Sequence, residues 1–130
     1  MVKLEAAFQR AFSRWVQNRW TGGPAAFELK RTLGHSIAVA AVKEHQVSAL
    51  QQVAGRGLYY KIPDGGFAQS PFDCFFLQGK AYVVIAYGEK LTGFYLIPIK
   101  EIELLRARGI VSITEKFARE FGTYHEIPIK

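Results

Sequence analysis

The sequence predicts a single α/β domain, residues 1–130, with a mixed central β-sheet flanked by helices. Three observations carry this prediction: an amphipathic N-terminal segment, several short β-rich runs bounded by turn residues, and the run Tyr82–Tyr87, which is apolar on both faces. A strand of that last kind is usually central in a sheet and covered by helices on both sides. A chain of 130 residues can bury about two thirds of the surface that its unfolded form exposes.

An amphipathic helix is expected over residues 3–20, because apolar side chains recur there at helical spacing: Leu4, Phe8, Phe12, Trp15 and Val16. A Gly-Gly-Pro turn then leads into an expected strand over residues 25–32. A second helix is expected over residues 42–53, and Gly55 and Gly57 end it.

Further strands are expected in the second half of the chain. Residues 58–62 read as a strand closed by the turn residues 63–66. The β-rich runs 72–77 and 81–87 are separated by Gln78-Gly79-Lys80, which predicts a hairpin between them.

The C-terminal part is expected to hold one strand and one short helix. The strand covers residues 94–99 and is ended by Pro98. Ser112 and Glu115 have the spacing of a capping box, which predicts a helix from there to about Phe121.

The charge balance favours polyanionic partners. The chain has 17 Lys and Arg against 11 Asp and Glu, a formal net charge of +6. Phosphate contacts need cations, so a basic chain meets a physical requirement for nucleic-acid binding without proving it. No run is long and apolar enough for a membrane span, and the N-terminus has no signal-peptide core, so we expect a soluble cytoplasmic protein without a membrane partner.

The single cysteine, Cys74, cannot form an internal disulfide and has no partner cysteines for a zinc site. This fits a reducing cytoplasm. We expect Cys74 to be a small, buried apolar side chain.

The strand Phe27-Glu28-Leu29-Lys30 holds the strongest candidates for chemistry. Side chains two residues apart share a face of a strand, so Glu28 and Lys30 project together while Phe27 and Leu29 point into the core. A carboxylate can bind a divalent cation that polarises a phosphate, and a neighbouring ammonium can stabilise the charge of the transition state. The alternative is an exposed strand ion pair with little energetic meaning.

A second carboxylate is needed for such a site, since Mg²⁺ requires about six ligands. The best candidate is Asp73, at the start of an otherwise hydrophobic strand, although it can equally be a strand-entry turn acid. Asp64 is better explained by the turn that contains it.

Six more residues are candidates for the site or for nucleic-acid contacts. Gln46, near the start of the second helix, can orient a metal-bound water or a phosphate, and the adjacent His45 can carry a proton or donate to phosphate, unless it only caps or packs. Glu5 in the first helix can reach toward the sheet or face water. Arg10 and Arg14 lie off the apolar stripe of that helix and, with Arg31 and His45, are candidate nucleic-acid contacts.

The strings Phe27-Glu28-Leu29-Lys30-Arg31-Thr32, Val42-x-x-His45-Gln46-x-x-x-Leu50 and Gly57-Leu58-Tyr59-Tyr60-Lys61-Ile62 resemble the core of the PD-(D/E)XK nuclease superfamily. More narrowly, they are similar to RecU-type Holliday junction resolvases. The fuller sequence, including Pro71-Phe72-Asp73-Cys74-Phe75 and Ser112-Ile113-Thr114-Glu115, resembles small phage and prophage proteins of the same superfamily.

This resemblance implies a restriction-endonuclease-like core and a Mg²⁺- or Mn²⁺-dependent DNA endonuclease that acts on branched duplexes as a homodimer. Glu28 would be a metal ligand, Lys30 the catalytic lysine, Glu5 the first-helix acid, and Gln46 a supporting residue. The family's first acid normally lies on a strand just before the acid-x-lysine strand, yet residues 21–27 contain no acid. Either Asp73 supplies the missing metal ligand, or the site is degenerate and the fold serves as a nucleic-acid or protein-binding module.

Overall fold

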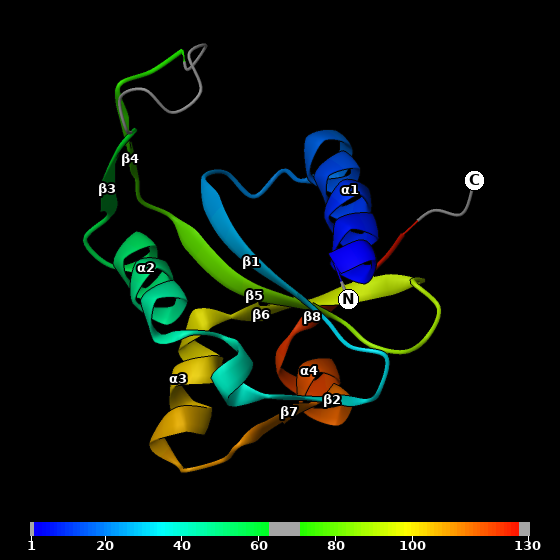
Figure 1. Cartoon of the computed structure of the whole chain (residues 1–130). Helices are drawn as coiled ribbons and strands as arrows, with labels where there is room; N and C mark the ends of the chain where they lie inside the picture. Colours follow the sequence, from blue (N-terminus) through cyan, green and yellow to red (C-terminus); the bar gives the residue numbers. More distant parts are fainter. Residues whose placement is uncertain (1, 63–70, 128–130) are drawn as a thin grey trace.

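The computed structural model describes residues 2–62 and 71–127, and the side chains from Glu5 onward within the first helix. The chain forms an α/β fold around a four-stranded mixed sheet of strand order β1-β5-β6-β8. Helix α1 covers one face of this sheet, whereas α2, α3 and α4 lie on the other side (Figure 1). The α/β class and the mixed sheet were correctly predicted. The expected turn at residues 63–66, with Asp64, lies outside the described residues.

The first two elements form largely where the sequence predicts them. Helix α1 spans Val2–Arg19, and strand β1 spans Ala25–Arg31. The aromatic side chains of α1 pack on the sheet: Phe12 contacts Phe27 of β1 with ring centroids 5.0 Å apart. This aromatic layer buries Phe8, Phe12 and Trp15.

Strand β5, Lys80–Ala86, lies inside the sheet as its apolar sequence predicts. It pairs in parallel with β1 and antiparallel with β6, Gly93–Pro98, and Val83, Val84 and Ile85 are fully buried. Side chains alternate between two cores: Val84 belongs to the aromatic layer under α1, whereas Val83 and Ile85 join the core under α2 and α3. Because both faces of β5 are buried, apolar residues at every position are stabilising there.

The second core is closed by helices and a small sheet. Helix α2 spans Glu44–Ala54, and α3 spans Ile99–Ala107 directly after Pro98. Strand β2, Ser36–Ala38, pairs with β7, Ser112–Thr114, and a 3₁₀ turn, Val39–Ala41, leads to α2. The sequence did not predict α3.

The expected hairpin across Gln78-Gly79-Lys80 is wrong. Strand β4, Cys74–Leu77, instead pairs with β3, Leu58–Lys61, in a separate two-stranded sheet. The amide of Gly79 donates to the carbonyl of Val53, and that of Lys80 donates to the carbonyl of Pro24. A side chain at Gly79 would meet Pro24. The glycine therefore lets the chain pass from one sheet into the other instead of turning back.

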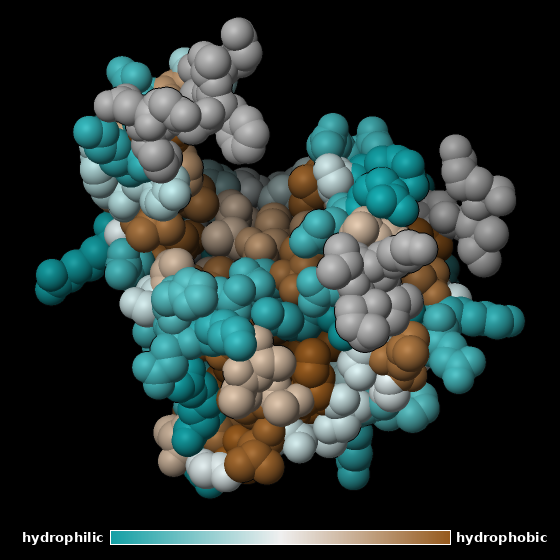
Figure 2. Space-filling view, in the orientation of Figure 1, coloured by the Kyte–Doolittle hydropathy of each residue, from teal (hydrophilic) through white to brown (hydrophobic). Residues whose placement is uncertain are grey.

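The β3–β4 hairpin stands apart from the rest of the molecule (Figure 1). Figure 2 shows a hollow between it and α1, with hydrophobic side chains on the floor. Cys74 is exposed on this hairpin, so the expectation that it is buried is wrong. A two-stranded sheet cannot bury both of its faces by itself, which leaves Cys74 in solvent.

The last helix begins later than its predicted capping box. Helix α4 spans Glu115–Phe121, and its N-cap is Thr114, whose hydroxyl accepts a hydrogen bond from the Phe117 amide at 3.0 Å. Ser112 lies in β7 instead. Strand β8, Thr123–Glu126, which the sequence did not predict, then pairs with β6 and completes the sheet.

Among the described residues, no helix is both long and apolar enough to cross a membrane.

Candidate functional site

Glu28 and Lys30 lie side by side on β1, as the two-residue period predicts. Their register partners on β5 are Val83 and Ile85, so both side chains project from the face that carries α2 and α3. The Lys30 Nζ is 3.4 Å from Glu28 Oε2, and the two side chains are 14% and 27% exposed. The pair is therefore half-buried rather than fully solvated, which strengthens the electrostatic interaction relative to a surface ion pair.

The two candidates on α2 are a helix-capping glutamine and an exposed histidine. The side-chain Oε1 of Gln46 accepts a hydrogen bond from the Lys43 amide at 2.9 Å, which caps the helix. This contact satisfies an amide that the start of a helix leaves unpaired. His45 is exposed on the first turn of α2. Neither the cap contact nor this exposure directs Gln46 or His45 to the acid–lysine pair.

Asp73 does not join Glu28. Its carbonyl accepts the Ile62 amide at 2.8 Å, just beyond the Lys61–Cys74 pair, whereas the Leu58–Leu77 pair lies at the end of the hairpin nearer the four-stranded sheet. Asp73 is thus at the outer part of the projecting β3–β4 hairpin (Figure 1). The structure does not bring Asp73 to Glu28, because β4 pairs with β3 in the projecting hairpin.

Glu5 is separated from the pair by the sheet itself. Glu5 is exposed on α1, and α1 packs on the face that carries Phe27 and Val84. Glu28 and Lys30 project from the opposite face. The structure therefore does not bring Glu5 to the acid–lysine pair, and its role as an acid of the same site stays a prediction.

Arg31 is held by backbone carbonyls at the end of β1. Its guanidinium donates to the carbonyls of Thr32 at 2.8 Å, Ala86 at 3.1 Å and Glu89 at 3.3 Å. Partial burial lowers the pKa of Arg31. The side chain ties the end of β1 to the segment after β5, so the expected contact of Arg31 with nucleic acid is not supported.

Arg10 and Arg14 are one helical turn apart on the exposed side of α1. A shallow hollow of about 460 Å³ lies beside them, lined by Ala6, Gln9, Arg10, Ser13 and Arg14. Among the ion pairs of the described residues, none involves either arginine. Two like charges at this spacing destabilise a helix slightly. An anion bound between the two guanidinium groups would reduce their repulsion.

One polar cluster could not be found from the sequence. Glu115 accepts from the Tyr95 hydroxyl at 3.2 Å, lies 2.8 Å from His35 Nδ1, and lies 3.9 Å from Arg119. Burial, together with Glu115, raises the pKa of Tyr95. His35 lies far from the other three residues in the sequence, and no spacing signal predicts that β2–β7 pairing brings it to them.

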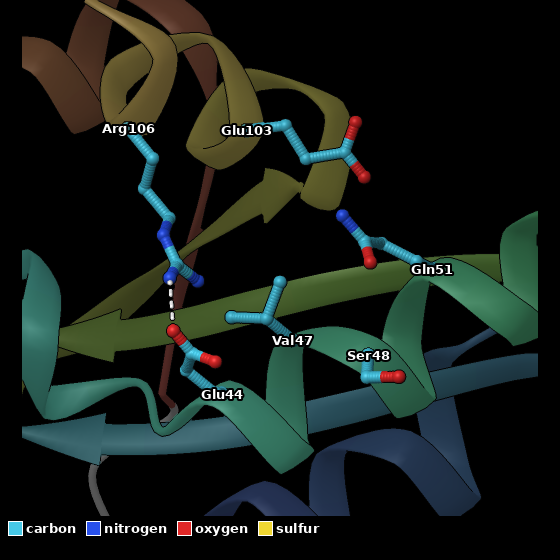
Figure 3. A pocket seen from close by; sticks show the side chains of 6 residues that line it. All are labelled: Glu44, Val47, Ser48, Gln51, Glu103 and Arg106. Atoms are coloured by element: carbon cyan, nitrogen blue, oxygen red, sulfur yellow. Dashed lines mark hydrogen bonds and ion pairs between the residues drawn. The ribbon is translucent and has the colours of Figure 1, made fainter. Parts of the chain in front are cut away.

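Two further hollows hold none of the predicted catalytic residues. One, of about 290 Å³, lies between α2 and α3, where Glu44 pairs with Arg106 at 3.4 Å beside Val47 (Figure 3). The other, of about 300 Å³, lies beside the aromatic layer and is lined by residues that include Trp20, Tyr82 and His125. Burial raises the pKa of Tyr82 and lowers that of His125.

The described residues do not bring together enough oxygen ligands for a magnesium or manganese ion. Both ions prefer several oxygen ligands. Of the predicted metal-binding carboxylates, Glu28 lies beside Lys30 and Asp73 does not. Within residues 2–62 and 71–127, no group of three or more His, Cys, Asp or Glu side chains is placed to hold a metal. The metal-ligand pair Glu28 and Asp73 is therefore not assembled.

The fold and site together define an α/β protein with a half-buried acid–lysine pair on an edge strand and two exposed arginines on the opposite layer. No family model matches the chain, and neither does any curated protein or solved structure.

Proposed function

We propose that this chain is a DNA-binding domain that contacts the phosphate backbone through α1. The observation that carries the proposal is the arginine pair Arg10 and Arg14, exposed on one side of the helix and without an acidic partner among the described residues. Phosphates bridging the two guanidinium groups would relieve their mutual repulsion.

The surroundings of the arginine pair suit a backbone contact. Ala6 and Ser13 are small, so a phosphate group can approach the helix without meeting a large side chain. The chain as a whole carries a net charge of +6, which attracts a polyanion at long range. Binding of this kind reads the shape and charge of DNA rather than its sequence.

Binding to labelled four-way junction and linear duplex DNA, measured by fluorescence anisotropy over a range of salt concentrations, tests the proposal. Each lost phosphate contact reduces the slope of log affinity against log salt by about 0.9. Arg10→Gln/Arg14→Gln should therefore reduce the slope by about 1.8. The matched control Lys100→Gln/Arg108→Gln removes the same charge from exposed positions on and just after α3, across the sheet, and should leave most of the slope intact.

Equal losses in the two double variants would mean that net charge alone governs binding, and the assignment to α1 would fail. The absence of binding by the wild type at low salt would reject the proposed function itself.

A second candidate is a metal-dependent endonuclease, which the side-by-side placement of Glu28 and Lys30 favours. The described residues do not provide the remaining oxygen ligands, so we derive no cleavage step. A nicking assay with and without Mg²⁺ separates the two functions. Mg²⁺-dependent nicking by the wild type that Glu28→Gln abolishes would establish the endonuclease. DNA binding without nicking would support the DNA-binding domain and reject the endonuclease.

A further inference from the structure

The hollow of about 300 Å³ beside the aromatic layer lies where α1 ends. It is lined by the two tryptophans of the chain, Trp15 and Trp20, and by side chains of three strands: Tyr82 of β5, Leu96 of β6 and His125 of β8. Its volume is at the lower end of the range for small-molecule sites, which are mostly apolar and aromatic with a few polar groups. The hollow therefore has the size and lining of a ligand site.

The indole ring of Trp20 is fixed by its neighbours. Its Nε1–H donates to the carbonyl of Gly23 at 2.7 Å, and its ring centroid is 5.3 Å from that of Phe27 and 5.9 Å from that of Tyr82. A Cβ at Gly22 would meet this ring, so the glycine lets the indole lie close to the backbone. Because the ring is already ordered, a flat ligand can pack against it at little entropic cost.

Two exposed cations also line the hollow, Arg19 from the last turn of α1 and Lys80 from the start of β5. Neither takes part in an ion pair within the described part of the chain. None of the described residues that line the hollow is acidic. The hollow therefore favours an anion, and two cations suit a phosphate group, which has several acceptor oxygens and up to two negative charges.

Polar groups that can recognise the edge of a ring lie beside the aromatic side chains. Burial lowers the pKa of His125, so its imidazole is neutral near pH 7 and offers one donor and one acceptor. The hydroxyls of Tyr82 and Thr123, which also line the hollow, can each donate and accept a hydrogen bond. Such groups match a ring that carries both donors and acceptors on its edge.

We propose that this hollow binds a nucleoside phosphate, with the base packed among the aromatic side chains and the phosphate held by Arg19 and Lys80. Every base has a flat face that stacks on aromatic side chains and an edge of donors and acceptors. A free mononucleotide and an unpaired nucleotide of a single strand present this same chemistry. The hollow shares no lining residue with the one beside Arg10 and Arg14, so the inference does not rest on the proposed DNA contact.

The fluorescence of the two tryptophans reports the occupancy of the hollow, because both of them line it. Adenosine monophosphate should quench this fluorescence in a saturable way, after correction with free tryptophan for the light that the nucleotide absorbs. Arg19→Gln/Lys80→Gln should weaken binding about tenfold or more, since both cations contact the phosphate. The matched control Lys100→Gln/Arg108→Gln removes the same charge outside the hollow and should leave the affinity nearly unchanged.

Gly22→Ala tests the aromatic lining without a change of charge. The added Cβ would displace the Trp20 ring, and the affinity for adenosine monophosphate should fall about fivefold or more, the effect of impaired stacking. Gly34→Ala is the matched control, because a Cβ there would make an ordinary contact. Unchanged far-ultraviolet circular dichroism should accompany both substitutions.

Adenosine and ribose 5-phosphate separate the contributions of base and phosphate, and each should bind more weakly than the nucleotide. A single-stranded oligodeoxyadenylate distinguishes the two sources of the ligand. Tighter binding per nucleotide than that of the mononucleotide would indicate a strand, and equal or weaker binding would indicate a free nucleotide. The proposal would be overturned if neither ligand quenched the fluorescence at millimolar concentration, or if Arg19→Gln/Lys80→Gln bound as tightly as its control.

Discussion

At the scale of single residues, the acid–lysine pair combines two opposite charges with partial burial. The two-residue period of a strand placed Glu28 and Lys30 together, and they lie 3.4 Å apart. The period could not reveal that the face on which they lie is covered by helices. Their partial burial follows from the pairing of β1 with β5, a contact between distant parts of the sequence.

Because Glu28 and Lys30 are partly buried, the effects of removing their charges on the free energy of unfolding should be coupled. We predict that Glu28→Gln alone and Lys30→Met alone each lower the free energy of unfolding by about 1–3 kcal/mol, because each leaves a half-buried charge uncompensated. The double variant should recover part of that loss, with a coupling energy above about 0.5 kcal/mol in urea denaturation. Strict additivity of the two substitutions would show that the ion pair contributes nothing to stability.

At the scale of elements, the sequence located most helices and strands but not all their boundaries. The capping-box spacing at Ser112 placed a helix start near the right position, yet Ser112–Thr114 forms β7 because it pairs with Ser36–Ala38. Local spacing cannot reveal this distant partner. Helix α4 therefore starts only after Thr114, where the strand ends.

The two possible caps of α4 can be distinguished by substitution. Thr114→Ala should destabilise the protein by about 1 kcal/mol, since it removes the oxygen that accepts the Phe117 amide. Ser112→Ala, two residues earlier, should have a much smaller effect, because Ser112 does not cap the helix. Thermal or urea unfolding of the two variants makes the comparison, and a larger effect at Ser112 would contradict the observed helix start.

At the scale of the whole molecule, the layered α/β architecture was predictable, whereas the composition of the site was not. The apolar run of β5 predicted a central strand with helices on both sides, and the structure confirms it. The place of Asp73 depends on whether β4 pairs with β5 or with β3, and both pairings satisfy the same apolar pattern. Gly79 decides between them through its contacts with Val53 and Pro24.

The same architecture predicts an uneven distribution of local stability. Amides of β5 and β6 should exchange with solvent most slowly, because these strands lie inside the four-stranded sheet and their side chains are buried. The amides of β3 and β4, in the separate two-stranded sheet, should exchange much faster. Hydrogen exchange followed by mass spectrometry measures this difference, and equal protection of the two sheets would refute it.

The parallel pairing of β1 with β5 also has a consequence for synthesis on the ribosome. Ala25 aligns with Lys80, and Gly93 of β6 aligns with Glu126 of β8. The N-terminal helix and β1 therefore cannot pack on β5, and their aromatic side chains remain exposed, until the middle of the chain has left the ribosome. The sheet is completed only when β8 has been made. The nascent chain is thus expected to need protection by a chaperone and to fold late.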